Sequence, residues 1–187
     1  MKINWLKPGL CSIQSLLSPR ETPRLLADAI RCGFQEQVFH PPHIPEIRFR
    51  AMGDFPDWAG LLFGRLTPVL PAFQPFLPQN EQTRESLWQP IGVNERFRFY
   101  RYDTFNQFAP HQDYAFVRSD DEQTWLSLVV YLNTDFEGGE TRFEDLTVRP
   151  TQGGALVYPH PFWHEGAIVL SGQKIILRSD ILYRRRF

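Results

Sequence analysis

The sequence predicts a mainly β fold, a sandwich or barrel of short strands supported by helices from the N-terminal half. From about residue 90 onward, the spacing of apolar residues changes from a helical period to the alternation of strands. Turn residues such as Gly138-Gly139 separate the strand-like runs. Many short strands with turns between them are typical of sandwiches and barrels, so we expect the helices to cover one face.

Two helices are expected in the first half of the chain. The first would begin at Ser18-Pro19, an N-cap followed by proline in the first turn, and would end at Gly33. The second would begin near Asp54 or Asp57 and end before Pro71. Apolar residues recur at helical spacing within both segments, which indicates that each helix packs one face against the core.

Five strand-like runs are expected in the second half: residues 96–102, 125–133, 140–143, 155–158 and 175–183. At 187 residues the chain has the length of one domain. We therefore predict a single domain over residues 1–187. Residues 1–90 would form a helical support region and residues 91–187 the β core.

Composition favours a protein that binds neither nucleic acid nor membranes. The formal net charge is −1, and the basic run Arg184–Arg186 is interpreted as a solvated chain end. Cys11 and Cys32 have neither metal-site spacing nor a disulfide framework. The sequence shows no signal-like start and no apolar run long enough to span a bilayer, so we expect a reduced, cytoplasmic setting.

A candidate metal site begins at His111-Gln112-Asp113. On a strand, residues i and i+2 point to the same side, so His111 and Asp113 can share one ion. His160 and His164 are the only histidines downstream, and His164 is preferred as third ligand because it begins a new strand-like run. Two imidazoles and one carboxylate form the facial triad of non-haem Fe(II) oxygenases. The alternative is that these residues are polar groups without a metal.

Two basic residues follow the last histidine. Lys174 lies ten positions after His164, and Lys174, Ile176 and Arg178 would share one face of a strand. Cations on an otherwise apolar strand are costly to bury without anions, and a dicarboxylate co-substrate would supply them. The alternative is that this face lies in solvent or that the cations pair with acids elsewhere in the chain.

Taken together and in order, these motifs resemble the Fe(II)- and 2-oxoglutarate-dependent dioxygenases of the prolyl 4-hydroxylase superfamily. The resemblance runs from about Arg96 to Tyr183. It consists of the strand of Tyr102, His111-Gln112-Asp113, Tyr131-Leu132-Asn133, Gly138-Gly139-Glu140-Thr141, His164-Glu165-Gly166, and Gly172-Gln173-Lys174 leading into Leu177-Arg178-Ser179-Asp180.

The resemblance implies a double-stranded β-helix, a cupin-like jelly roll with the metal at its open end. The iron ligands that it implies are His111, Asp113 and His164. Lys174 would pair with the C5 carboxylate of 2-oxoglutarate, and Tyr102 and Tyr131 would hydrogen-bond this co-substrate. Arg178 is a second candidate for the co-substrate, because some relatives use an arginine further along this strand where prolyl hydroxylases have a small polar residue.

The function expected on this basis is hydroxylation of a C–H bond in a prolyl or other small-molecule or peptide substrate, with O2 consumed and succinate and CO2 as co-products. Ascorbate is expected as the reductant that restores Fe(II). One alternative is a non-catalytic module that binds metal or 2-oxoglutarate. Another is a cupin-type iron dioxygenase that does not use 2-oxoglutarate, which Lys174 and Arg178 disfavour. The sequence leaves open the substrate and the oligomeric state.

Overall fold

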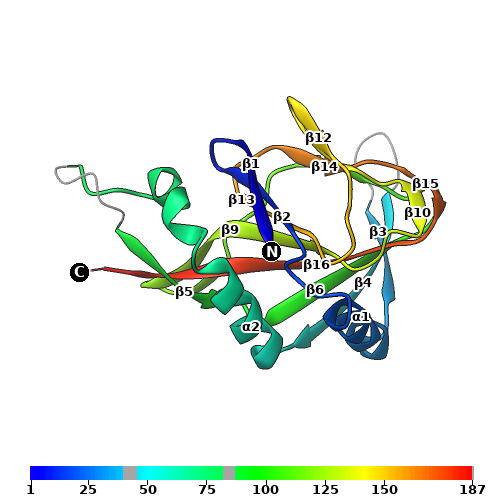
Figure 1. The fold of residues 1–187 in the computed structure, drawn as a ribbon, viewed down its shortest axis with the longest axis horizontal. Coiled ribbons are helices and arrows are strands. Elements are labelled where there is room, and N and C mark those ends of the chain that lie inside the picture. The colour runs from blue at the N-terminus through cyan, green and yellow to red at the C-terminus, as the bar shows by residue number, and fades with distance from the viewer. Residues whose placement is uncertain (40–45, 82–86, 187) are drawn as a thin grey trace.

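The protein is a mainly antiparallel β structure with two α-helices on one face, as a computed structural model shows (Figure 1). The structure describes residues 1–39, 46–81 and 87–186. The strands form a large sheet and a small sheet that face each other as in a jelly roll, which confirms the predicted fold class. None of the helices in the described ranges combines the length and apolar character needed to cross a membrane.

The main sheet contains ten strands within the described residues, and all pairs are antiparallel. Its order is β1 (Lys2–Lys7), β2 (Leu10–Gln14), β13 (Ala155–Pro159), β9 (Glu122–Tyr131), β16 (Lys174–Arg185), β6 (Arg96–Tyr102), β4 (Glu46–Asp54) and β3 (Gln35–Phe39). Off this path, β5 (Trp88–Val93) pairs with β16 and β8 (Val117–Ser119) pairs with β9.

The small sheet brings together segments that are far apart in the sequence. Its order is β12 (Leu146–Val148), β11 (Thr141–Phe143), β14 (His164–Gly166) and β7 (Phe108–His111). A separate pair is formed by β10 (Phe136–Gly138) and β15 (Val169–Gly172). The pairing of β14 with β7 sets His164 directly opposite His111.

Both faces of the main sheet are buried. Because side chains alternate along each strand, those on one face belong to one apolar cluster and those on the other face to a second. Leu128 of β9 and Leu177 of β16 belong to the cluster beneath the helices. Their neighbours Val129 and Ile176 belong to a second cluster, which includes Phe143 of the small sheet. Successive side chains of a strand point to opposite faces, so one strand can serve the core with one set and the site with the other.

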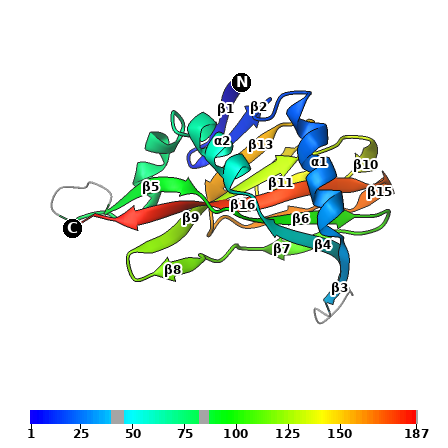
Figure 2. The same cartoon turned by 90° about the horizontal axis from the view of Figure 1, so that it is seen from below.

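Two α-helices cover the first of these faces, α1 (Glu21–Cys32) and α2 (Pro56–Leu66). Figure 2 shows them on one side of the main sheet and β7 on the other. Ser18 and Glu21 cap α1 reciprocally: Ser18 Oγ accepts from the Glu21 N–H, and a Glu21 carboxylate oxygen accepts from the Ser18 N–H. The helix ends at Gly33, whose φ of 75° only glycine adopts readily.

The second helix ends before Pro71, as expected, but another helix follows it. α2 stops at Leu66 and is followed by a 3₁₀ helix, Leu70–Phe76, that contains Pro71. A proline in the first turn of a 3₁₀ or α-helix loses no intrahelical hydrogen bond, so Pro71 begins a new helix instead of only ending an old one.

Residues 1–90 also differ from the helical support region that the sequence predicts, because β1 to β4 lie there and extend the main sheet at both ends. The edge strands β1 and β3 carry many polar side chains, so their alternation is weak. The five expected strands are all present, although β9 ends at Tyr131, before residue 133.

We predict that Leu177→Ala lowers the free energy of unfolding by about 2–5 kcal/mol, because it leaves a cavity in the centre of the main sheet. Leu177 is fully buried and pairs with both neighbouring strands. Urea denaturation measures the change. Leu170→Ala on β15, where the side chain is 55% exposed, serves as control and should change stability by less than about 0.5 kcal/mol. Equal effects of the two substitutions would contradict this view of the core.

Candidate metal centre

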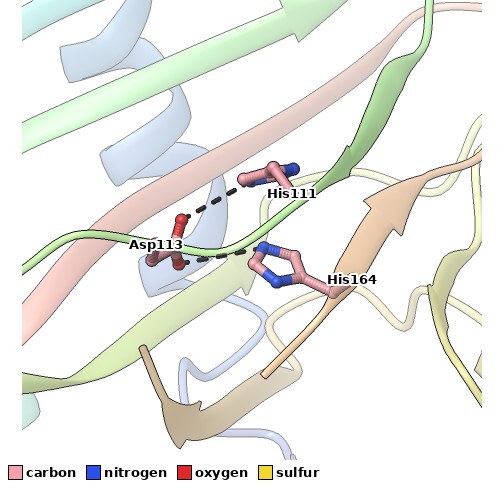
Figure 3. Close-up of side chains that lie close together, drawn as sticks. All are labelled: His111, Asp113 and His164. Atoms are coloured by element: carbon pink, nitrogen blue, oxygen red, sulfur yellow. Dashed lines mark ion pairs between the residues drawn. The ribbon is translucent and has the colours of Figure 1, made fainter. Parts of the chain in front are cut away.

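The structure brings His111, Asp113 and His164 together (Figure 3). One ligand atom of each lies within 4.8 Å of the others, and no other such group of His, Cys, Asp or Glu occurs in the described part of the chain. Nε2 of His111 lies 3.5 Å from Asp113 Oδ1, and Nε2 of His164 lies 3.8 Å from Oδ2. His160, the alternative third ligand, lies outside this group.

The small sheet positions both histidines. His111 is the last residue of β7 and His164 the first residue of β14, and their ring centroids are 4.2 Å apart. Phe108 stacks on the His111 ring with a centroid distance of 3.8 Å. Asp113 follows the end of β7, so its direction depends on contacts beyond the strand and not on alternation alone.

Hydrogen bonds to backbone carbonyls set the tautomer of both rings. Nδ1 of His111 lies 2.8 Å from the Ala109 carbonyl oxygen, and Nδ1 of His164 lies 2.8 Å from that of Phe162. A carbonyl only accepts, so each Nδ1 carries the proton and each Nε2 of a neutral ring has a free lone pair. This is the arrangement by which proteins orient metal-binding histidines.

Asp113 is buried and ionised. Burial raises its pKa, but the adjacent His111 ring and the nearby charge of Arg178 outweigh this, and the pKa lies well below its usual value. Ser127 Oγ donates to Oδ2 at 2.5 Å. Oδ1 accepts no hydrogen bond from the described residues, although Arg178 Nη2 lies 2.7 Å away. Burial lowers the pKa of His164 to about 4, so this ring is neutral at neutral pH.

The three side chains fit a divalent ion such as Fe(II). Oδ1 of Asp113 and the two Nε2 atoms supply one oxygen and two nitrogens, the donor set of the facial triad. The Tyr158 hydroxyl donates to Nε2 of His164 at 3.0 Å, which occupies the lone pair that an ion needs. That hydroxyl must therefore turn to another acceptor when an ion binds.

Lys174 lies in the same pocket as the two histidines. It is buried, and its Nζ donates to the Gly139 carbonyl at 2.7 Å. Within the described ranges no carboxylate lies at ion-pair distance from Nζ, and burial lowers the pKa of Lys174 to about 8. Gly139 has a φ of 64°, and a Cβ there would lie only 3.1 Å from Lys174 Cδ, so glycine is required beside the lysine.

Arg178 occupies a different electrostatic environment. It lines the same pocket, but its guanidinium lies 2.7 Å from Asp113 and 3.9 Å from Asp180. Burial lowers the pKa of Arg178, but these two carboxylates outweigh it and raise the pKa above its usual value. Arg98 on the paired strand β6 also contacts Asp180. The protein itself therefore neutralises Arg178, whereas no carboxylate of the described residues lies at ion-pair distance from Lys174.

The two tyrosines differ in their access to the pocket. Tyr102 lines it, with the ring centroid 5.5 Å from Lys174 Nζ. Tyr131 is fully buried, and its hydroxyl hydrogen-bonds Thr141 Oγ1 at 2.7 Å. Thr141, and not Tyr131, lines the pocket, so Tyr131 lies behind the wall that Thr141 forms.

Three residues near the centre were not predicted as parts of it: Ser127, Tyr158 and His160. Ser127 stands within the apolar run of β9, and a hydroxyl in such a run indicates a buried polar partner. Its partner is the carboxylate of Asp113. Sequence alone does not show which distant residue that partner is.

The comparisons with known proteins agree with the fold and with the motif order. Residues 97–179 match the model of the 2OG-Fe(II) oxygenase superfamily, which confirms the resemblance and the enzyme class that it implies. Iron(II) and 2-oxoglutarate are the metal and co-substrate for which that superfamily is named. No curated protein is a significant match.

Solved structures of low sequence identity share the fold. The viral collagen prolyl hydroxylase from Paramecium Bursaria Chlorella virus-1 has 19% identity and a TM-score of 0.58, over 95% of this chain and 97% of that one. The prolyl-4-hydroxylase of Pseudomonas putida has 20% identity and a TM-score of 0.60, over 96% and 94%. The prolyl hydroxylase of Trichoplax adhaerens, in complex with a peptide fragment of hypoxia inducible factor, has 14% identity and a TM-score of 0.63, over 93% and 83%.

We predict that 2-oxoglutarate binding to the Mn(II)-loaded protein takes up a proton near pH 9. In the free protein Lys174 has a pKa of about 8, below its ordinary 10.5, so it is largely neutral at pH 9. A bound carboxylate favours the charged form and raises that pKa. Affinity should therefore fall as the pH rises above about 8. Calorimetry in buffers of different ionisation enthalpy measures the uptake.

Lys174→Arg is the matched control, because a guanidinium keeps its charge at pH 9 and has no proton to gain. This variant should show no proton uptake on binding and a flatter dependence of affinity on pH. Equal uptake by both proteins would mean that a group other than Lys174 titrates.

Proposed function

We propose that this protein, whose residues 97–179 belong to the 2OG-Fe(II) oxygenase superfamily, hydroxylates a C–H bond of a prolyl or other peptide or small-molecule substrate. The observation that best supports this proposal is that a metal-binding group and a buried lysine occur close together at one pocket. Two histidines with unprotonated Nε2 atoms and a buried carboxylate lie near a buried lysine that has no carboxylate at ion-pair distance among the described residues. A metal would explain the first group, and an anionic ligand would explain the second.

In this proposal His111, Asp113 and His164 hold Fe(II). Because the protein supplies three ligands from one side, positions remain for a co-substrate and O2. When bound, Fe(II) and 2-oxoglutarate supply the oxidation of the C–H bond by O2, with succinate and CO2 as co-products. Ascorbate is the proposed reductant that returns oxidised iron to Fe(II) after unproductive turnover.

Lys174 is the proposed partner of the distal carboxylate of 2-oxoglutarate. Lys174 and Arg178 are four residues apart on β16, or about 13 Å along the strand, so they serve opposite ends of the pocket. Arg178 contacts Asp113 and so marks the metal end. Tyr102 packs beside the lysine and is proposed to contact the co-substrate, and Tyr131 is proposed to act through Thr141.

An open groove next to His164 is the proposed substrate site. Pro110, Phe143 and Trp163 supply its apolar wall, and Trp163 is 56% exposed. An exposed indole offers a flat apolar face to a pyrrolidine ring. Proline-containing peptides are therefore the first substrates to test, as the names of the structural neighbours also suggest, and free amino acids the second.

Turnover without substrate tests the proposed function directly. The purified protein should convert 2-oxoglutarate slowly to succinate, only with Fe(II) and O2 present, and faster with ascorbate. His111→Ala should abolish the activity, since two remaining ligands hold the ion poorly. Nucleic acid should not stimulate it, because the chain has no net basic charge. Succinate release is measured by mass spectrometry.

Anaerobic titration with Fe(II) and 2-oxoglutarate is the companion measurement, monitored by the visible charge-transfer absorption of the ternary complex. Absorption without succinate would indicate a binding module instead of an enzyme. Absence of both, with protein of verified integrity, would contradict the proposal.

Substitution separates the roles of the two cations. Lys174→Ala should weaken 2-oxoglutarate binding by about 30- to several-thousand-fold, since a buried charged partner contributes about 2–5 kcal/mol. Metal affinity should change far less. Arg178→Ala should alter metal affinity more than 2-oxoglutarate binding. Arg184→Ala, a half-exposed arginine on the same strand, is the control. A larger effect of Arg178→Ala on 2-oxoglutarate binding would assign the anchor to Arg178.

A further inference from the structure

We propose that His160 is a positioning residue that holds Asp113 ready for the metal by way of the hydroxyl of Ser127. The inference rests on the metal site proposed above and assigns new roles to two residues outside the three ligands. His160 approaches Asp113 by two independent routes, one through side chains and one through the backbone.

The side-chain route is a short buried chain of hydrogen bonds. Ser127 Oγ lies 2.5 Å from Asp113 Oδ2 and 2.8 Å from His160 Nδ1. All three residues are buried, with 6% or less of their surface exposed. Groups this deeply buried have no bulk water as an alternative partner. Breaking one of these hydrogen bonds therefore leaves a buried polar group unsatisfied.

The donor and the acceptor in each hydrogen bond of this series follow from the groups at its two ends. The ionised carboxylate of Asp113 only accepts, so the Ser127 hydroxyl donates to it. The serine oxygen then accepts from His160 Nδ1, which must carry the ring proton. His160 Nε2 consequently accepts from the hydroxyl of Thr124, 3.0 Å away.

The hydrogen bonds at the other end of this series, at Thr124, run in the same direction. The Thr124 oxygen accepts the backbone N–H of Phe116 at 2.9 Å, which leaves its own hydrogen for His160. One tautomer of His160 therefore satisfies every hydrogen bond in the series from the Phe116 N–H to Asp113 Oδ2. The relay, defined here as Thr124, His160, Ser127 and Asp113, runs in one direction only.

The backbone route fixes the same aspartate. The Asp113 N–H donates to the His160 carbonyl at 3.0 Å, and the His160 N–H donates to the Trp125 carbonyl at 3.1 Å. Pro159 and Pro161 flank His160, and prolines restrict the backbone on either side. The Gln112 side chain adds a bond to the Pro161 carbonyl at 2.6 Å. The segment that carries Asp113 is thus held by the segment that carries His160.

The consequence is that Oδ1 of Asp113, which accepts no hydrogen bond from the described residues, is the oxygen left open to an ion. Arg178 Nη2 lies 2.7 Å from Oδ1, and a guanidinium can bind both oxygens of a free carboxylate in a fork. With Oδ2 held by Ser127, Arg178 competes for one oxygen only. Without Ser127, the carboxylate can turn, and Arg178 can capture both oxygens at the expense of the metal.

The first test uses the metal alone. Anaerobic Co(II) titration of the apoprotein, monitored by the visible d–d absorption, reports affinity and ligand geometry without turnover. Ser127→Ala should weaken Co(II) binding by about 10- to 100-fold, the usual effect of losing a group that orients a ligand. Ser179→Ala is the matched control: Ser179 is equally buried, on the adjacent strand β16, but its hydroxyl donates to the Asn94 carbonyl. Its affinity should stay within about twofold of the wild type.

Two substitutions of His160 test the direction of the relay. His160→Asn keeps a donor at the position of Nδ1 and should bind Co(II) within a few-fold of the wild type. His160→Gln places its amide at the position of Nε2, loses the donor to Ser127, and should weaken binding as much as Ser127→Ala does. The Ser127→Ala/His160→Gln double variant should be no weaker than either single variant, because both break one chain. Thermal unfolding checks that all variants are folded.

The outcomes separate this inference from the metal site on which it rests. Equal Co(II) affinity of Ser127→Ala and Ser179→Ala would overturn the relay, as would additive losses in the double variant. Asp113→Ala should abolish specific Co(II) binding in either case. Unchanged binding by Asp113→Ala would overturn the metal site and the relay together.

Discussion

The central constraint on this structure is the burial of one ionised carboxylate, Asp113, between two sheets. An isolated charge in such a place is very costly, so the surroundings must supply compensation in charge and in hydrogen bonds. Arg178 supplies the charge and Ser127 the hydrogen bond, and both lie on central strands of the main sheet. Two imidazoles lie beside this carboxylate, His111 nearest Oδ1 and His164 nearest Oδ2, and both carry their proton on the far nitrogen, Nδ1. The negative charge of Asp113 is thus only partly compensated on the side of the two imidazoles, and a divalent ion fits there.

The alternation of β9 and β16 allows this polar centre to exist inside a stable fold. Leu128 and Leu177 point to the helices and join a large apolar cluster, whereas Ser127 and Arg178 point to the small sheet. A slip of one residue in either strand would move charges beneath the helices and leucines into the site. The apolar face therefore fixes the register, and the register in turn fixes the positions of the polar groups.

The sequence predicted the parts of the site that depend on local spacing. His111 and Asp113 are two residues apart and belong to one metal-binding group, and Lys174 and Arg178 share a strand face and line one pocket. Alternation accounts for the shared face of Lys174 and Arg178, whereas Asp113 lies beyond the end of β7. The 3₁₀ helix after α2 was not predicted, because Pro71 is compatible with both the end of one helix and the beginning of another. The strands of the first ninety residues were not recognised, since outer strands carry a weak pattern.

Contacts between distant segments were beyond sequence reasoning. His160 was considered only as an alternative metal ligand, yet its ring faces Ser127, 33 positions earlier in the chain. The partner of a buried hydroxyl depends on which strands become neighbours, here β9 and β13. For the same reason, the contact of Arg178 with Asp113, a pair far apart in the sequence, was not foreseen.

The charges of the site also imply an order of binding. In the free protein Arg178 is neutralised by Asp113 and Asp180, and the buried Lys174 remains without an anion among the described residues. In the proposed metal complex a divalent ion on Asp113 would leave one net positive charge there, while Arg178 and Arg98 share Asp180. Together with Lys174, the pocket would then carry positive charge near each end, which suits a dicarboxylate. Before the ion binds, Asp113 and Arg178 neutralise each other, so the metal end offers such a ligand no net attraction. We therefore expect the metal to bind first, because it gives that end of the pocket the positive charge that attracts a carboxylate.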